Sequence, residues 1–361
     1  MNIKKNIWKW FYPGIKMKRW IFLIVLGLIL IFMGITLIFD IHFIAIVESM
    51  IFYLNNYLIG PEFSVYYWIF SFLILLSGIV LTLWSFKKME IRLSEEFLTN
   101  KELIDVLYEN RLLEKGPNIV SLGGGTGLSN LLRGFKKYSS NITAIVTVAD
   151  DGGSSGKLRD ELNILPPGDI RNCLVALADT EPLMEKLMQY RFEKKGDLAG
   201  HSFGNLFIAS MTEVTGDFEK AIKESSEVLA LKGQVLPSTN ENIHLGAQYI
   251  DDTVQMGESD IPTEEKRIKK VFLEPASCKP TSDSIKAIKE ADIISIGPGS
   301  LYTSILPNLL IEEITEALRK SDAIKVYICN VMTQPGETTG YSVSDHIKAI
   351  YEHVGNNIFD Y

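Results

Sequence analysis

Two long apolar segments near the start of the chain constrain its fold most strongly. Trp20 to Phe39 and Val65 to Trp84 each run about 20 residues without a charged side chain, the length at which an α-helix crosses the apolar interior of a bilayer. We therefore expect transmembrane helices at 20–39 and 65–84, within a membrane anchor formed by residues 1–86. A secretory signal is the alternative for the first segment, but its apolar run is long and no small-residue cleavage pattern follows it.

Charged residues around these segments predict how they are oriented. Lys and Arg lie before the first segment and directly after the second, whereas Asp40 to Ser64 contains neither. Basic flanks mark the cytoplasmic side of a membrane protein. We expect a multi-pass protein of the cell membrane, with both termini and the soluble domain in the cytoplasm. The apolar segments hold no Asp, Glu, Lys or Arg, which argues against a channel or pump.

The remainder divides into a linker and one folded region. Residues 87–116 carry Glu, Lys and apolar residues at helical spacing before Gly116-Pro117, which predicts a juxtamembrane helical linker; pairing of two chains through it would give a homo-oligomer. Residues 117–361 are long enough for one large domain. The net charge is −8 despite the basic N-terminus, so this region lacks the basic character of nucleic-acid-binding proteins. Its three cysteines show no C-x-x-C spacing, which argues against zinc and disulfides.

Apolar runs rich in β-formers alternate with helical patterns in residues 117–361. This alternation predicts an α/β fold, a Rossmann-like, mostly parallel sheet with helices on both faces. Ligands bind such sheets at the carboxyl ends of the strands, so the polar loops there are candidate sites. The expected strands are 118–122, 142–148, 293–296 and 324–329, and the expected helices include 128–138 and 311–319.

A glycine-rich loop follows the first expected strand. In strand–loop–helix order, glycines let the backbone approach an anion, and the free N–H groups of the next helix point toward it. The loop lacks the Gly-Lys-Ser/Thr ending of a Walker A motif, and Leu128 replaces the third glycine of a dinucleotide fingerprint. A tight turn without a ligand is the alternative interpretation. The candidate phosphate ligands are Gly123, Gly124, Gly125, Thr126 and Gly127.

A pair of acids follows the second expected strand. Asp150 and Asp151 could hold sugar hydroxyls or Mg²⁺, and Ser154 and Ser155, which come shortly after, could receive phosphate. An exposed polar turn is the alternative. An acid at the end of a second strand also contacts ribose in NAD-binding proteins, which keeps an NAD-dependent oxidoreductase as a weaker hypothesis.

Two further loops add candidates from the middle of the chain. Asp169 is placed to cap a helix, with a catalytic role as the alternative, and Arg171 with its neighbour Asn172 could grip phosphate. Arg171 could equally be a surface ion-pair partner. His201 and Asn205 lie beside glycines that would allow a ligand to approach, so they are candidate donors to a sugar or substrate.

The last strands are also followed by polar loops. The loop after residues 293–296 repeats the strand–turn–helix order of an anion site, and Asn330 to Thr338 follows the next strand in the same way. The candidate phosphate ligands of the first of these loops are Gly297, Gly299, Ser300, Leu301 and Tyr302.

Together these motifs resemble the YvcK family, also called the gluconeogenesis factor family, of the CofD-like superfamily. The resemblance covers 117–361 and rests on the segments 123–127, 150–156, 167–172, 200–205 and 297–304. It implies a Rossmann-like protein that binds UDP-sugars, notably UDP-N-acetylglucosamine, and regulates cell-wall synthesis and cell shape. On this reading it is a regulator without a required cofactor, with a cell-wall enzyme as the expected partner.

The same resemblance implies an enzymatic alternative. The 2-phospho-L-lactate transferases of the superfamily use similar loops with Mg²⁺ to pass a phospholactyl group from a nucleotide donor, and Asp150 and Asp151 would then hold the metal. The membrane anchor is additional to the common soluble form. Residues 356–361 are expected to begin a further strand that family members continue.

Overall fold

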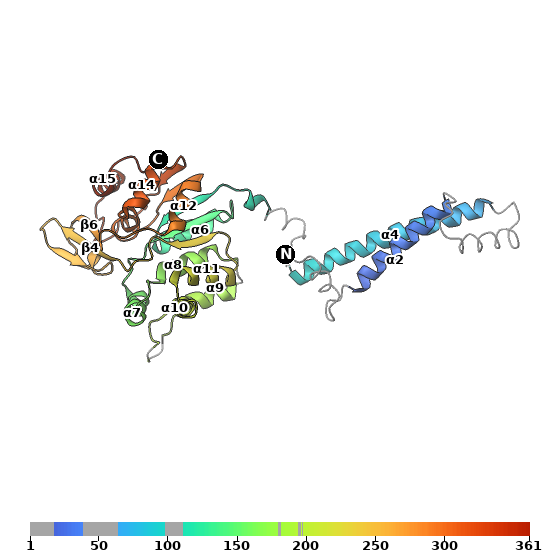
Figure 1. Cartoon of the computed structure of the whole chain (residues 1–361), viewed down its shortest axis with the longest axis horizontal. Helices are drawn as coiled ribbons and strands as arrows, with labels where there is room; N and C mark the ends of the chain where they lie inside the picture. The colour runs from blue at the N-terminus through green and yellow to red at the C-terminus, as the bar shows by residue number, and fades with distance from the viewer. Residues whose placement is uncertain (1–17, 39–63, 98–110, 180–181, 194–195, 197) are drawn as a thin grey trace. The chain divides into compact units, whose positions relative to one another are not determined.

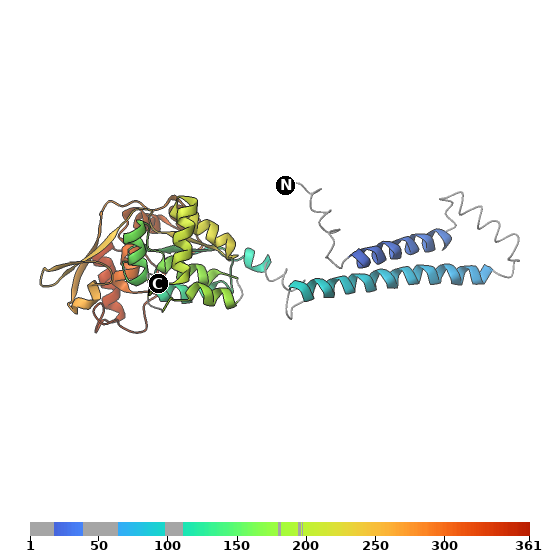
Figure 2. The same ribbon diagram turned by 90° about the horizontal axis from the view of Figure 1, so that it is seen from below.

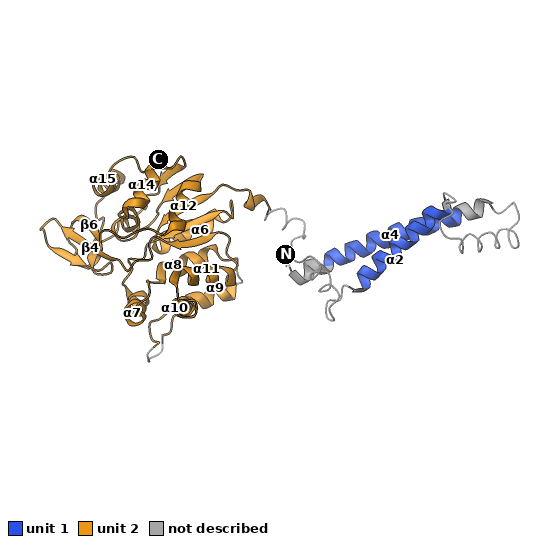
Figure 3. Cartoon of the chain, viewed as in Figure 1, with its two compact units in different colours: residues 1–109 blue, residues 110–361 orange. Residues whose placement is uncertain are grey.

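The computed structural model describes residues 18–38, 64–97, 111–179, 182–193, 196 and 198–361. The chain divides into two compact units, residues 1–109 and 110–361 (Figure 3). The basic residues before Lys18, the segment 39–63 and residues 98–110 of the predicted linker lie outside the described residues, so the predicted orientation and this part of the linker stay predictions.

The first unit is a pair of long apolar helices that lie side by side, α2 (Lys18–Ile38) and α4 (Ser64–Phe97) (Figures 1 and 2). Glycines bring their backbones together: a Cβ atom added at Gly34 would lie 2.7 Å from Leu75 Cβ. Both helices are long and apolar enough to cross a membrane. Helix α4 continues without a break to Phe97, so the start of the expected linker is an extension of the second apolar helix.

The Trp20 and Trp84 rings meet edge to face, with 5.3 Å between centroids. Large apolar side chains such as Phe22, Phe70 and Leu83 are exposed on the outside of the pair. Apolar side chains therefore lie on the outside of the pair as well as between the two helices.

The second unit is built on a parallel sheet, as predicted. Its strand order is β3-β2-β1-β7-β8, with β1 in the middle. The chain first adds β2 and β3 on one side of β1, and later adds β7 and β8 on the other side. Ile119 of β1 lies opposite Ile142 on one side and Ile293 on the other. A crevice outside the carboxyl ends is expected where the order reverses, next to β1. The strands are β1 (Ile119–Gly123), β2 (Ile142–Val146), β3 (Gln234–Pro237), β7 (Ile293–Ile296) and β8 (Ile324–Tyr327).

Helices pack against this sheet around one continuous apolar core. Helix α6 packs on α8, and α12 packs on α14. The predicted helix 128–138 begins earlier, at Gly125, and the predicted helix 311–319 corresponds to α14. The helices are α6 (Gly125–Phe135), α7 (Gly153–Leu162), α8 (Gly168–Leu177), α9 (Pro182–Gln189), α10 (Phe203–Thr215), α11 (Phe218–Val228), α12 (Ser282–Glu290), α13 (Leu306–Leu309), α14 (Glu312–Lys320) and α15 (Val343–Val354), with short helical turns η3 (Ile261–Glu264) and η4 (Leu301–Ile305).

A small antiparallel sheet, which the sequence patterns did not predict, lies between β3 and β7 in the chain. It has the order β5-β4-β6, formed by β4 (His244–Tyr249), β5 (Val254–Met256) and β6 (Ile268–Glu274). These strands form one end of the second unit in Figure 1. The turn that follows β5 contributes to the candidate site.

The end of the chain differs from the expectation of a strand at 356–361, because no strand forms there. Tyr361 nevertheless donates its N–H to the carbonyl of Lys325 at 3.2 Å and accepts the N–H of Tyr327 at 2.8 Å. This pair of bonds is the pattern of a parallel ladder, so Tyr361 lies as a strand partner on the free edge of β8.

Candidate functional site

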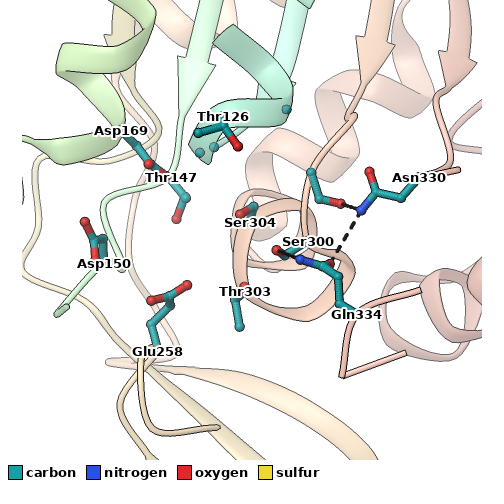
Figure 4. A pocket seen from close by; sticks show the side chains of 14 residues that line it. Thr126, Thr147, Asp150, Asp169, Glu258, Ser300, Thr303, Ser304, Asn330 and Gln334 are labelled. Carbon is teal, nitrogen blue, oxygen red and sulfur yellow. Dashed lines mark hydrogen bonds between the residues drawn. The ribbon is translucent and has the colours of Figure 1, made fainter. Parts of the chain in front are cut away.

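A pocket of about 330 Å³ lies at the carboxyl ends of the parallel strands (Figure 4). It is polar, and its walls come from the loops after β1, β2, β7 and β8, from the start of α8 and from the turn after β5. The lining residues are Gly124, Gly125, Thr126, Gly127, Thr147, Asp150, Asp169, Glu258, Gly299, Ser300, Thr303, Ser304, Asn330 and Gln334.

One wall is the glycine loop and the start of α6. Gly124 is the N-cap residue, and no side chain caps the helix from that position. The Asp169 carboxylate accepts the N–H of Gly125, and a Cβ atom at Gly124 would lie 2.5 Å from Asp169 Oδ2. At Gly127 a Cβ atom would lie 2.9 Å from the carbonyl oxygen of Pro298. The glycines therefore admit a carboxylate and a neighbouring loop, while the positive end of the α6 dipole faces the pocket and favours an anion there.

The opposite wall is formed by the loops after β7 and β8, which are hydrogen-bonded to each other. Asn330 Nδ2 donates to the carbonyl of Gly299 at 2.9 Å, and Gln334 Nε2 donates to Ser300 Oγ at 2.7 Å. The two loops that the sequence identified separately are thus one structure, and Asn330 and Gln334 line the pocket themselves.

Glu337 supports this wall from behind. Its carboxylate accepts the N–H of Tyr302 at 3.3 Å and the hydroxyl of Thr303 at 3.2 Å. Burial raises the pKa of Glu337. Because Glu337 already takes the Tyr302 N–H, and the Tyr302 hydroxyl bonds to that of Tyr341 at 2.9 Å, Tyr302 is turned away from the pocket. Gly297 and Leu301 do not line it either.

Three carboxylates, from Asp150, Asp169 and Glu258, line one side of the pocket, opposite the Asn330 and Gln334 amides in the view of Figure 4. Burial and the neighbouring Asp150 raise the pKa of Asp169 to about 6. Burial, followed by Asp150 and Asp169, raises the pKa of Glu258 to about 8. The negative charge of this side is therefore partly neutralised by protons near neutral pH.

Two of the predicted acids have positions that the sequence did not indicate. Asp169 was expected to cap α8, but the N-cap residue is Pro167, and Asp169 lies in the first turn with its carboxylate on the glycine loop. Asp151 does not line the pocket. Its Oδ2 and Oδ1 accept the backbone N–H groups of Glu258 and Ser259, both at 2.9 Å.

The other predicted candidates form a second, buried cluster. Ser154 Oγ lies 3.1 Å from His201 Nδ1 and accepts the Asn205 amide at 3.1 Å. Arg171 donates to Ser202 Oγ and, at 2.8 Å, to Asn172 Oδ1. Neither these side chains nor Ser155 line the pocket, so their predicted contacts with a ligand stay predictions. The buried Asn205 Oδ1 and Arg171 Nε have no hydrogen-bond partner.

Mg²⁺ suits the donors of the pocket only in part. No group of three or more His, Cys, Asp or Glu placed to hold a metal occurs among the described residues. Mg²⁺ is commonly held by one or two carboxylates together with ligand phosphates and water. Asp150 and Asp169 could supply such a pair, whereas the predicted partner Asp151 is occupied by backbone N–H groups.

Besides Asp169, six lining residues were not singled out as site residues from the sequence. Thr303 and Ser304 directly follow the candidate ligands of the loop after β7. Asn330 and Gln334 lie in a loop that the sequence did identify, and Thr147 was placed inside the second expected strand. Glu258 had no signal, because it follows a strand of the unpredicted antiparallel sheet.

The fold and pocket define a class of protein: a doubly wound α/β domain with glycine-rich and polar loops at the carboxyl ends of its parallel strands. Residues 119–361 match the family described as 2-phospho-L-lactate transferase CofD, and the chain belongs to this family.

Individual relatives agree with the resemblance to the gluconeogenesis factors. The chain is 59% identical over 244 residues to the gluconeogenesis factor of Bacillus subtilis, covering 68% of this chain and 77% of that protein. A relative from Nostoc sp. is 48% identical over 370 residues and covers 98% of this chain and 78% of its own length, so the similarity extends into the first unit. The crystal structure of a UPF0052 family member from Bacillus halodurans superposes with a TM-score of 0.67 at 58% identity, covering 68% of this chain and 79% of that one.

Proposed function

We propose that this protein is a regulator of the gluconeogenesis factor type that binds a UDP-sugar, notably UDP-N-acetylglucosamine, and acts on cell-wall synthesis and cell shape. The pocket carries the proposal: it combines the glycine loop and the start of α6, whose helix dipole suits phosphate, with carboxylates, which suit sugar hydroxyls. The names of the relatives support a regulatory role.

The test is calorimetric titration of the full chain in detergent with UDP-N-acetylglucosamine, with and without Mg²⁺. The nucleotide is recovered afterwards and checked for breakdown. Saturable binding of a ligand that is recovered intact supports the regulator. A folded chain that binds no UDP-sugar under either condition contradicts the proposal.

The apolar helices α2 and α4 favour a place for this regulator at the cell membrane, next to the synthesis of wall precursors. The soluble unit would then face the cytoplasm, with a cell-wall enzyme as its partner. Membrane fractionation of cells that express the full chain tests this part. Recovery in the supernatant after high-speed centrifugation would contradict it.

An Mg²⁺-dependent transferase of the 2-phospho-L-lactate type is the second candidate, favoured by the family description and by Asp150 and Asp169 in the pocket. When bound, the ion would offset the charge of the donor phosphates, and these two carboxylates would hold it. The glycine loop and the start of α6 would orient those phosphates, and the loops after β7 and β8 would close the opposite wall. Mg²⁺-dependent breakdown of the recovered nucleotide would favour this candidate.

An NAD-dependent oxidoreductase remains the weakest alternative. It relies on a partial glycine fingerprint whose third position is Leu128, a fully buried core residue. A thermal-shift assay with NAD and NADP decides this point, because a binding site for either would raise the unfolding temperature. No shift with either compound would exclude this alternative.

A further inference from the structure

One carboxylate of the pocket comes from outside the parallel sheet. Glu258 lies in the turn between β5 and η3, in the part of the chain that forms the antiparallel sheet. It lines the pocket together with Asp150 of the loop after β2 and Thr303 of the segment after β7. The antiparallel sheet thus contributes one side chain to a site that is otherwise built by the parallel sheet.

Asp151 holds this turn in place. Both of its carboxylate oxygens are used, since they accept the N–H groups of Glu258 and Ser259 at 2.9 Å each. Gly257 has a φ of +103°, and a Cβ atom there would lie 3.1 Å from Asp151 Oδ2, so the turn follows closely around the carboxylate. Asp150 and Asp151 therefore have different tasks: the first lines the pocket, and the second holds the turn that carries Glu258.

The charges around Glu258 indicate which part of a ligand it meets. No Lys, Arg or His is among the residues that line the pocket, whereas Asp150, Asp169 and Glu258 all do. A phosphate group beside three carboxyl groups would be repelled wherever they are ionised. Hydroxyl groups are uncharged donors and acceptors, so they can pair with a carboxyl group in either protonation state. Asp169 lies against the glycine loop and takes the Gly125 N–H, so the phosphates are expected at the remaining N–H groups of the loop and of the α6 start, where the helix dipole favours an anion.

We propose that Glu258 is a specificity-determining residue that binds the hydroxyl groups of the sugar, and that Asp151 is the residue that positions it. This inference rests on the proposed function and deepens it, because it assigns recognition of the sugar to the turn after β5 and recognition of the diphosphate to the parallel sheet.

The experiment compares two probes, UDP and UDP-N-acetylglucosamine, by calorimetric titration of the full chain in detergent. Glu258→Ala is expected to weaken binding of the UDP-sugar about tenfold, the effect of losing one hydrogen bond to a carboxyl group, and to leave UDP affinity unchanged. Asp151→Asn should show the same selectivity to a smaller extent. Asp251→Asn is the matched control: Asp251 also accepts a turn N–H beside β5, from Thr253 at 3.1 Å, but does not line the pocket.

A conservative variant separates this proposal from a metal-binding role. Glu258→Gln keeps a donor and an acceptor and should restore most of the affinity lost in Glu258→Ala. If Glu258→Gln is as weak as Glu258→Ala and wild-type binding depends on Mg²⁺, Glu258 acts on a cation and the proposal is wrong.

Other outcomes are equally decisive. Equal losses for UDP and the UDP-sugar in Glu258→Ala would show a structural role and contradict the inference. Unchanged affinity for both probes in Glu258→Ala would contradict the inference alone and leave the proposed function standing. A wild-type chain that binds neither probe would overturn both.

Discussion

The carboxylate of Asp151 accepts the backbone N–H of Glu258, with 2.9 Å between Oδ2 and N, across 107 positions of the sequence. This bond joins the loop after β2 to the turn after β5. It explains why the second acid of the Asp150-Asp151 pair is absent from the pocket and why Glu258 is present there. The position of Glu258 beside Asp150 and Asp169 in the pocket therefore depends on Asp151.

Gly124→Ala should disturb the pocket, because its Cβ atom would lie 2.5 Å from Asp169 Oδ2 and 2.9 Å from Thr147 Cγ2. We expect a loss of about 2 kcal/mol in the free energy of unfolding and at least about tenfold weaker binding of UDP-N-acetylglucosamine. Thermal unfolding and calorimetric titration measure the two effects.

Gly134→Ala is the control in the same helix, since nothing lies within 4 Å of its added Cβ atom. It should stabilise α6 by up to about 1 kcal/mol. Equal behaviour of the two variants would contradict the assigned role of Gly124.

Glu337→Ala should loosen the wall formed by the loops after β7 and β8, because the Tyr302 N–H and the Thr303 hydroxyl lose their acceptor. A buried donor without a partner costs about 1–3 kcal/mol, so the unfolding temperature should fall. This wall is expected to face the diphosphate, so affinity for UDP and for the UDP-sugar should fall by similar factors. A loss confined to the UDP-sugar would contradict this arrangement.

The second unit should become less stable as the pH rises from about 4.5 to about 8. In this range Glu258 is protonated in the folded chain and ionised in the unfolded chain. The pKa of Glu258 is raised from 4.5 to about 8, so between these values the folded chain binds more protons than the unfolded chain. Glu258→Gln removes the titrating carboxyl group and, with it, this loss of stability at higher pH. The variant should lie within about 1 kcal/mol of the wild type near pH 5 and be more stable than the wild type by about 4 kcal/mol near pH 8. Thermal unfolding at both pH values, with exposed Glu316→Gln as the control, measures the difference. Parallel pH profiles for wild type and Glu258→Gln would contradict the assignment.

Gly34→Leu should separate α2 from α4, because even a Cβ atom at Gly34 would lie 2.7 Å from Leu75 Cβ and 2.8 Å from its Cα. The Trp20–Trp84 contact should then weaken, which near-ultraviolet circular dichroism of the full chain in detergent would detect. Ile29→Leu is the control, since Ile29 is exposed on the outside of α2. An unchanged tryptophan signal in Gly34→Leu would show that this close contact does not hold the helices together.

Much of the architecture could be predicted from local patterns. The apolar segments at 20–39 and 65–84 correspond to α2 and α4, and the alternation of strands and helices correctly predicted the parallel sheet. The glycine loop, Asp150 and Ser300 were identified because glycine and polar residues directly follow strands, and the carboxyl ends of parallel strands lie along one edge. These predictions depend only on neighbours in the chain.

The tertiary structure decided which polar side chains share the pocket. Asp151 and Tyr302 lie in the same sequence motifs as residues that line the pocket, but neither lines it. Asp151 instead accepts the backbone N–H groups of Glu258 and Ser259, and the Tyr302 N–H is bound by the Glu337 carboxylate. Asp169 reaches the glycine loop instead of capping its own helix, and Glu258 arrives from a sheet that the patterns did not indicate. Local sequence determined the strands, the loops and the apolar helices, because hydrophobic periodicity and glycine act over a few residues. Contacts between distant segments determined the site, because which donor meets which carboxylate depends on how those segments pack.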